Sequence, residues 1–261
     1  MTHTEVAFNC FAGTDTGRRR PHNEDAYICD PETGIFLIAD GMGGENYGEV
    51  ASRLTADQFT DIIKPFLMDD DMTIPFDHNS DEDYFIQTLK HAAKETNSAV
   101  VAYADENITH KGMGSTLTAV VFHNQALYVT HVGDSRLYRF DGQILNQITE
   151  DHTRVQEMVN KELITKQDAR LHPDRHIITR CVGRKKRMQP DLFTLDISFN
   201  SIYLICSDGL NDMVTDQTIT EILSTSESLD LSGQALINRA NENGGKDNIT
   251  LILFQPVLKP E

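Results

Sequence analysis

The sequence predicts an α+β fold with antiparallel sheets. Three observations lead to this class: strand-like apolar runs occur in groups, turn-forming residues separate the runs within a group, and helix-like segments lie between the groups. Regular alternation of single strands with helices, which is typical of parallel sheets, is absent from the pattern. The chain has 261 residues, enough for a substantial core, so we expect one domain over residues 1–261.

Strands and two long helices are expected in the first half of the chain. Residues 6–10 alternate like a half-buried strand. Residues 27–29 and 34–39 are two further strand-like runs, separated by the turn-forming sequence Asp-Pro-Glu-Thr-Gly. Apolar residues then recur at helical spacing over residues 48–67 and 85–103, which predicts two amphipathic helices.

The second half returns to strands before two final helices. Asp141 and Gly142 are typical of a tight hairpin between two of these strands. Residues 151–187 are less regular. The expected strands are 115–123, 126–132, 135–140, 144–148, 192–197, 201–206 and 248–254, and the expected helices are 215–224 and 230–241.

An acidic connection joins the two long helices of the first half. It lacks the fixed ligand spacing and the loop glycine of an EF-hand, so a solvated connection is favoured over a calcium site. Its acidic residues are Asp69, Asp70, Asp71, Asp77, Asp81, Glu82 and Asp83.

Composition disfavours several classes of partner. With 23 Lys and Arg against 40 Asp and Glu, the net charge is -17, which disfavours binding to nucleic acid or to an anionic membrane surface. The N-terminus lacks the features of a signal peptide, and no apolar run approaches the roughly 18 residues of a membrane span, so a cytoplasmic location is expected. The four cysteines have no C-x-x-C spacing, which disfavours a disulfide framework and a zinc knuckle, and three of them lie in apolar, strand-like surroundings typical of packed thiols.

Five short acidic clusters are distributed along the chain. In most of them the acid ends an apolar, strand-like run or directly precedes one, so a sheet can bring the carboxylates together. Converging carboxylates repel one another unless a cation lies between them, and hard divalent ions are the usual partners of all-oxygen ligand sets. The pattern therefore predicts a centre for several Mg²⁺ or Mn²⁺ ions. The acids concerned are Glu24, Asp25, Asp40, Asp134, Asp208 and Asp247.

These clusters belong to eight short motifs in a distinctive order. Arg-Pro-His-Asn-Glu-Asp covers residues 20–25, Asp-Gly-Met-Gly-Gly covers 40–44, and Cys-Ser-Asp-Gly-Leu covers 206–210. Together the motifs resemble the bacterial branch of the PPM family, the metal-dependent type 2C serine/threonine protein phosphatases. The resemblance implies a four-layer αββα sandwich of two antiparallel sheets flanked by helix pairs, with a dimetal site at one end. The remaining motifs lie at 114–116, 133–136, 151–153, 178–180 and 244–250, and residues 48–52 follow the second motif.

The resemblance also implies a set of metal ligands. Asp40 is the carboxylate that would bridge two tightly bound Mn²⁺ or Mg²⁺ ions. Asp208 and Asp247 match the terminal ligands of the first ion. Glu24 and Asp25 match the pair that serves the second ion, largely through waters.

Further residues complete the expected site. By resemblance, the carbonyl oxygen of Gly41 would bind the second ion, and Asp134 with Asp208 would hold a third, weaker ion. Arg20 is the expected phosphate clamp, because a guanidinium presents a planar fork to two phosphoryl oxygens. In the eukaryotic branch a His proposed to protonate the leaving group follows the Asp-Gly pair. Met42 occupies that position here, so another group must supply the proton.

Other motif residues are expected to have structural roles. Arg136 and Arg180 are interpreted as salt-bridge partners and not as substrate contacts. Most of the motif histidines are expected to pack or to form hydrogen bonds. They are His22, His131, His152 and His176.

The expected reaction is hydrolysis of phosphoserine and phosphothreonine by direct attack of a metal-bridging hydroxide. Two ions roughly 3.5 to 4 Å apart can lower the pKa of a shared water and hold it in line with the scissile bond. The sequence contains neither a G-x-S-x-G elbow nor a C-x5-R loop, so no phosphoenzyme is required. Residues 151–187 resemble the family's flap beside the cleft and are expected to select protein substrates.

The resemblance implies phosphorylated proteins as partners, together with a eukaryotic-like serine/threonine kinase that the enzyme opposes, and a monomeric state. Two alternatives stay open: a phosphatase dedicated to one regulatory phosphoprotein, such as an anti-anti-sigma factor, and a catalytically inactive member that acts as a binding module. The inactive member predicts a broken ligand set, whereas every predicted carboxylate is present. A nucleotide-binding enzyme is disfavoured, because the third position of G-x-G-x-x-G falls on Asn46.

Overall fold

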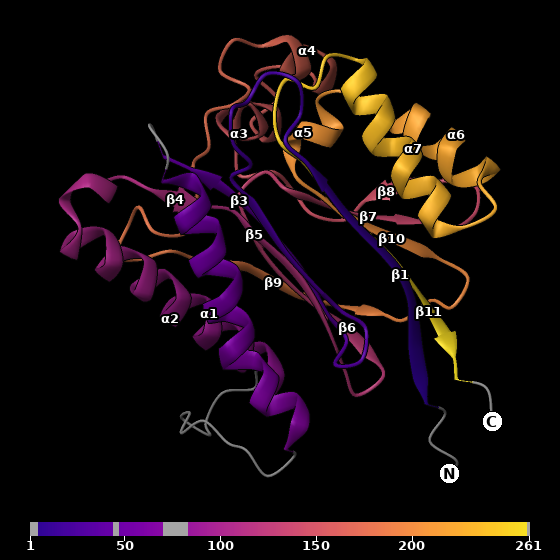
Figure 1. Ribbon diagram of the computed structural model, residues 1–261, viewed down its shortest axis with the longest axis horizontal. Helices are drawn as coiled ribbons and strands as arrows, with labels where there is room; N and C mark the ends of the chain where they lie inside the picture. The colour runs from indigo at the N-terminus through magenta and orange to yellow at the C-terminus, as the bar shows by residue number, and fades with distance from the viewer. Residues whose placement is uncertain (1–4, 44–46, 70–82, 260–261) are drawn as a thin grey trace.

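Two antiparallel sheets packed face to face form the centre of the computed structural model, which describes residues 5–43, 47–69 and 83–259 (Figure 1). The first sheet has the strand order β1-β11-β10-β7-β8, and the second has the order β2-β3-β5-β6-β9 with the short β4 beside β3. The bounds in the first sheet are β1 (Val6–Asp15), β11 (Ile249–Leu258), β10 (Ile202–Cys206), β7 (Arg136–Phe140) and β8 (Leu145–Gln147). Those in the second are β2 (Asp25–Asp30), β3 (Ile35–Met42), β4 (Gly114–Ser115), β5 (Leu117–His123), β6 (Ala126–Val132) and β9 (Asp191–Asp196).

A pair of helices covers the outer face of each sheet (Figure 1). The amphipathic helices α1 and α2 bury apolar side chains such as Phe59 and Leu89 against the second sheet. The helices α6 and α7 bury Ile219 and Leu236 against the first. The predicted α+β class and the four-layer αββα sandwich are therefore confirmed. The bounds are α1 (Gly48–Met68), α2 (Tyr84–Glu106), α6 (Asp216–Thr225) and α7 (Leu229–Glu242).

Large aromatic side chains fill the space between the two sheets. The ring of Phe36 in β3 stacks on that of Phe254 in β11 with a centroid distance of 4.2 Å. Tyr203 in β10 stacks on the same Phe254 at 5.0 Å. All three side chains are fully buried, and aromatic burial of this extent contributes strongly to a core. The stack ties together the strands that carry the predicted metal ligands.

The first and last strands are longer than the sequence predicts. β1 and β11 pair along their whole length, from Val6 opposite Leu258 to Asp15 opposite Ile249. Only parts of these strands show a clear apolar pattern, because burial along β1 is mostly partial. The pairing brings the two ends of the described chain side by side (Figure 1).

The hairpin predicted at Asp141 is present, with a longer loop than a tight turn. Phe140 pairs with Leu145, so four residues connect β7 to β8. The Asp141 side chain accepts hydrogen bonds from the backbone N–H groups of Gln143 and Ile144, at 3.0 and 2.8 Å. This side-chain bonding is the usual reason for an Asp at a turn.

Residues 151–187 contain two short helices that the sequence pattern did not predict. Both have a threonine N-cap, and Thr165 forms a capping box with Asp168. Helices of two turns or fewer give no periodic apolar signal, since their stability comes from caps and tertiary contacts. A third short helix, at the end of β10, was missed for the same reason. The bounds are α3 (Arg154–Asn160), α4 (Lys166–Leu171) and α5 (Asp208–Asn211).

Most of the acidic connection between α1 and α2 falls at residues 70–82, outside the described residues. The solvated connection predicted there therefore stays a prediction. Asp83, at its end, has a definite role as the N-cap of α2. Its carboxylate accepts hydrogen bonds from the backbone N–H groups of Phe85, at 2.8 Å, and Ile86, at 3.2 Å.

All four cysteines are free, and Cys206 is buried while the other three are half-buried. Cys206 is fully buried in β10, and burial raises the pKa of its thiol to about 12, which makes it unreactive. Within the described ranges, none of the helices combines the length and apolar character needed to cross a membrane.

Candidate metal centre

The predicted carboxylates converge at one end of the sandwich, where strands of both sheets end. Asp25 opens β2 and lies directly opposite Asp40 of β3 in the antiparallel register. Asp208 follows β10, and Asp247 precedes β11, which pairs with β10 in the other sheet. Asp134 lies in the turn after β6 and is buried. The packing of the sheets therefore brings together acids that are far apart in the sequence.

A pocket of about 840 Å³ opens at this end of the molecule. Its floor carries five of the six predicted acids, and its wall includes residues of the flap-like segment 151–187. Asp25 lies outside its lining and instead borders a neighbouring depression with Glu49 and Arg53. The residues that line the pocket include Arg20, His22, Glu24, Asp40, Gly41, Met42, Asp134, Arg175, His176, Arg184, Asp208, Asp212, Lys246 and Asp247.

Close backbone packing fixes the segment around Gly41. Its N–H donates a 3.1 Å hydrogen bond to the carbonyl of Glu24. A Cβ atom at this position would collide with the carbonyl of Gly48 at the start of α1, so only glycine fits. The hydroxyl of Ser52 in α1 also donates to the carbonyl of Glu24, at 2.6 Å. The glycine in this motif therefore permits α1 to pack directly behind the metal centre.

Asn248 holds the loop that carries Arg20, a role that was not predicted from the sequence. Its side-chain amide donates to the carbonyls of Thr16 and His22, each at 2.9 Å. Its Oδ1 accepts a 2.8 Å bond from the N–H of Glu24. One buried side chain thus fixes both ends of the loop relative to β11. A side chain that satisfies three distant backbone groups cannot be recognised from local sequence.

Burial and neighbouring negative charges raise the pKa of four of the converging acids. Burial, followed by the charges of Asp25 and Asp208, raises the pKa of Asp40 well above its ordinary value. Burial, with the charges of Asp134 and Asp247, does the same for Asp208. Burial also raises the pKa of Asp134 to about 7 and that of Asp25 to about 6. Although the Asp40 and Asp208 side chains are partly accessible from the pocket, protein surrounds them on most sides. The fold concentrates negative charge where water solvates it poorly.

The donor set fits divalent cations. The six predicted acids offer carboxylate oxygens, the preferred ligands of Mg²⁺ and Mn²⁺. Asp25 accepts a 2.8 Å hydrogen bond from Ser207 through Oδ2, while its buried Oδ1 has no hydrogen-bond partner. The buried Oε2 of nearby Glu49 also has none. Buried polar atoms are normally satisfied, so such oxygens indicate a place for a ligand.

The arginines of the motifs behave differently from one another. Arg20 lies on the pocket wall, half exposed, with its Nη2 2.6 Å from Oδ2 of Asp247. Arg136 is mostly buried and donates through Nε and Nη2 to both carboxylate oxygens of Asp151. Arg180 donates to Asp191 at 2.6 Å. The predicted salt-bridge roles of Arg136 and Arg180 are thus confirmed.

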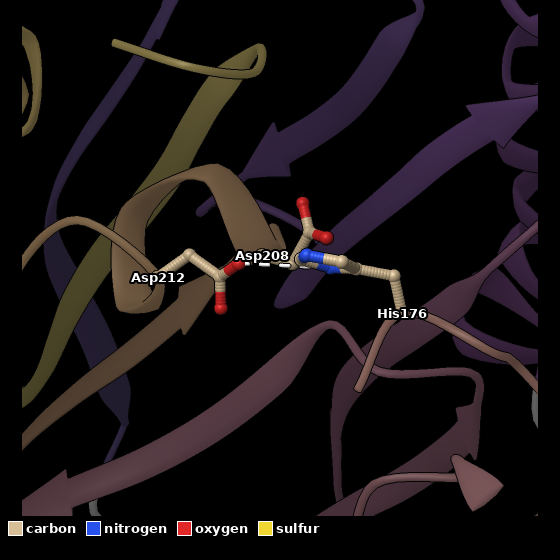
Figure 2. Close-up of side chains that lie close together, drawn as sticks. All are labelled: His176, Asp208 and Asp212. Atoms are coloured by element: carbon tan, nitrogen blue, oxygen red, sulfur yellow. Dashed lines mark ion pairs between the residues drawn. The ribbon is translucent and has the colours of Figure 1, made fainter. Parts of the chain in front are cut away.

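His176 is not one of the motif histidines that pack. It comes from the segment after α4, is exposed, and reaches towards the two ends of α5 (Figure 2). Its Nδ1 is 3.7 Å from Oδ2 of Asp212, and one ligand atom each of His176, Asp208 and Asp212 lie within 4.8 Å of one another. Asp212 was not predicted as a site residue, because it lies outside the motif that contains Asp208. His131 and His152 are buried and hydrogen-bonded, whereas His22, like His176, is exposed, so the expected packing holds for two of the four motif histidines.

Comparison with known proteins identifies the family. A sequence model of protein phosphatase 2C matches residues 12–253. The chain belongs to the protein phosphatase 2C family. The serine/threonine phosphatase Stp of Listeria monocytogenes is 34% identical to it over 245 residues, which are 93% of each chain.

Solved structures agree with this assignment to the protein phosphatase 2C family. The crystal structure of the serine/threonine phosphatase PstP of Mycobacterium tuberculosis has 35% sequence identity and a TM-score of 0.81, covering 95% of this chain and 98% of that one. A catalytic domain of PstP solved in complex with two manganese ions also has a TM-score of 0.81, with 33% identity over 97% of this chain and all of that one.

Proposed function

We propose that this chain is a metal-dependent protein serine/threonine phosphatase that hydrolyses phosphoserine and phosphothreonine in proteins. The observation that carries this proposal is the pocket in which buried carboxylates from both sheets converge, with Arg20 on its wall. The relatives Stp and PstP are named serine/threonine phosphatases, and a PstP catalytic domain binds two manganese ions, which supports the same reaction here.

The converging acids would hold two tightly bound Mn²⁺ or Mg²⁺ ions. Acids of both sheets act electrostatically on Asp40, which therefore suits a bridging ligand. Asp208 and Asp247 would complete the first site. Glu24 and Asp25, with the carbonyl oxygen of Gly41, would serve the second.

When bound, such ions activate water as a nucleophile near neutral pH and neutralise phosphoryl charge, so that no phosphoenzyme is required. The protein's own groups orient the substrate. The guanidinium of Arg20 can take two phosphoryl oxygens once it leaves Asp247, because its planar fork matches their geometry. Met42 lines the pocket and offers no proton, so the proton for the leaving alkoxide comes from elsewhere.

Asp134 would hold a third, weaker ion together with Asp208. Its burial and its raised pKa are consistent with an acid that needs a cation nearby. His176 and Asp212 lie close to Asp208 on the same side of the pocket, so they are further candidates to contact this ion or its waters (Figure 2).

The chain would act as a single, monomeric phosphatase domain in the cytoplasm, opposing a eukaryotic-like serine/threonine kinase. The segment 151–187 would form its flap, since Arg175, His176 and Arg184 of this segment line the pocket. A phosphatase dedicated to one regulatory phosphoprotein would share the same site and differ only in its substrate. An inactive binding module is disfavoured, because the full set of acids is present.

The test is hydrolysis of p-nitrophenyl phosphate and of a phosphothreonine peptide by the purified protein. Activity should require added Mn²⁺ or Mg²⁺ and should return when the metal is restored after chelation. Circular dichroism of the chelated sample establishes that it remains folded. Full activity after exhaustive chelation, or no activity with either metal in folded protein, would contradict the proposal.

A further inference from the structure

The longest run of consecutive Lys and Arg residues in this acidic chain lies beside the pocket. Residues 184–187 read Arg-Lys-Lys-Arg, in a protein whose net charge is -17. All four residues are exposed. The run ends the flap-like segment, and neither the metal centre nor the core uses its last three residues. Its position and charge therefore need an explanation of their own.

The backbone of this basic run is anchored at both ends. Val182 and Met188, which flank it, are buried. The buried side chain of Asn97 in α2 accepts a 2.9 Å hydrogen bond from the N–H of Gly183 and donates one of 2.9 Å to the carbonyl of Lys185. Gly183 has a φ of +89°, and a Cβ there would collide with α2, so the chain can pass this close only as glycine. The basic side chains are thus presented to solvent from a fixed backbone.

The run begins at the pocket itself. Arg184 lines the pocket and donates through Nε to the carbonyl of Gly112, at 3.1 Å. The three residues that follow extend at most about 10 Å from it, at about 3.3–3.6 Å per residue. An extended peptide with its phosphorylated residue in the pocket would cover that distance with roughly three to four flanking residues.

The last three cations of the run have no side-chain partner in the described part of the chain. Within the described part of the chain, the side chains of Lys185, Lys186 and Arg187 form no hydrogen bond or ion pair. Some other surface cations do have acidic partners. Lys64 lies 3.0 Å from Asp30, for example. Three adjacent unpaired cations create a positive patch that is available to an anionic ligand.

We propose that residues 184–187 form a docking surface for an acidic segment of the substrate, with Asp or Glu residues close to the phosphorylated residue. The proposal rests on the proposed phosphatase function and names the class of phosphoprotein that it prefers. Repulsion from the rest of the acidic surface is screened beyond about 8 Å at physiological ionic strength, whereas contacts at the run are shorter. A long nucleic acid or a membrane would extend past the run onto the acidic surface, so a short acidic peptide fits better.

The test compares phosphothreonine peptides of equal length whose flanking residues on each side are either Asp or Asn. With Mn²⁺ present, kcat/KM of the wild-type protein should be about tenfold higher for the Asp peptide, equivalent to about 1.4 kcal/mol shared among exposed ion pairs. The triple variant K185A/K186A/R187A should lose this preference because its KM for the Asp peptide rises. Its rates on the Asn peptide and on p-nitrophenyl phosphate should be unchanged. Raising the salt concentration should reduce the wild-type preference.

A charge-matched control separates docking from net charge. The variant K64A/R239A/K259A also loses three surface cations, all outside the pocket lining, and should keep the preference. Equal kcat/KM for both peptides in a wild-type enzyme that hydrolyses p-nitrophenyl phosphate would overturn the docking proposal alone. A second result would also overturn it: the triple variant keeps the preference for the Asp peptide but loses binding to single-stranded RNA or to phosphatidylserine vesicles that the wild type shows. Absence of p-nitrophenyl phosphate hydrolysis in the wild type would instead overturn the phosphatase function.

Discussion

Two groups of carboxylates near the same end of this phosphatase have opposite surroundings. Asp151 accepts hydrogen bonds from Arg136, and Asp191 accepts them from Arg180 and His152. Asp40, in the pocket, has no Lys or Arg of the described chain within ion-pair distance, taken as 4.0 Å. The two groups adjoin, since the charge of Asp151 contributes to the raised pKa of the pocket residue Asp134.

The difference shows how one fold uses the same residue type in two ways. Burial raises the pKa of Asp191, but hydrogen bonds from His152 and Arg180 more than offset this and leave it below the usual range. The pKa of Asp40 is raised because burial and like charges act without such a partner. Paired acids stabilise the fold, whereas the pocket acids destabilise it until a cation binds. Each prediction below tests this contrast.

Replacing Asp40 should give the largest effect of these substitutions, and the effect should be a loss of activity. Asp40→Asn keeps the shape of the side chain and removes the charge that would bridge the two ions. We expect kcat on a phosphothreonine peptide to fall by on the order of 10³-fold or more, because activation of the nucleophile depends on both ions. Asp196→Asn, at an exposed position at the end of β9, serves as control and should leave kcat unchanged. Near-normal kcat in Asp40→Asn would refute the bridging role.

Replacing Asp151 should affect stability instead. Asp151→Asn leaves the mostly buried guanidinium of Arg136 without its counter-charge, a change that typically costs about 3 kcal/mol. Chemical denaturation measures this loss in the free energy of unfolding. Asp57→Asn, which breaks the exposed pair with Arg53, should cost about 0.5 kcal/mol or less. Equal losses in the free energy of unfolding for the two substitutions would show that burial of an ion pair does not determine its contribution to stability.

Arg20 connects the two groups, because it is the one arginine that pairs with a pocket acid, Asp247, in the described chain. If it clamps the phosphoryl group, Arg20→Ala should raise KM about tenfold or more and lower kcat less. The matched control is Arg19→Ala, since Arg19 is exposed and lies outside the pocket lining. A fall in kcat with KM unchanged would assign Arg20 to the metal centre and not to substrate binding.

A smaller effect is expected when pH is varied in the presence of a chelator. The quantity that should change is the stability of the folded protein. The pKa values of Asp25 and Asp134 are raised to about 6 and about 7 in the folded protein. These carboxyl groups therefore bind protons more tightly in the folded protein than in the unfolded protein. Their contribution to stability is therefore present at low pH and lost as pH rises from about 4 to about 7. Unfolding with EDTA across this range should show the loss, and saturating Mn²⁺ should remove it. A metal-independent pH profile would contradict the contrast.

The sequence predicted the main elements and the acids because both depend on local pattern. Apolar runs identified the strands, and Asp40 and Asp208 were recognisable at the ends of such runs. The helices α3 and α4 were not predictable, because they are too short to show periodicity and depend on caps such as Thr165.

Other parts of the site depend on contacts between distant segments. Asn248 binds three backbone groups of a loop more than 200 positions away in the sequence. His176 approaches Asp212 only because the flap-like segment folds over the end of β10. The basic run at 184–187 is visible in the sequence, but its place beside the pocket follows from the bonds of Asn97 to Gly183 and Lys185.

The pocket acids are placed for a cation and not for the stability of the fold. Thermal unfolding of wild type and of Asp208→Asn, each in EDTA and in saturating Mn²⁺, tests this placement. In EDTA the variant should have the higher Tm, because one member of a repelling, buried set is neutral. In Mn²⁺ it should have the lower Tm, because a ligand is lost and binding stabilises the folded state less. A Tm of the variant that is lower than that of wild type by the same amount in EDTA and in Mn²⁺ would show that the pocket acids are not placed for a cation.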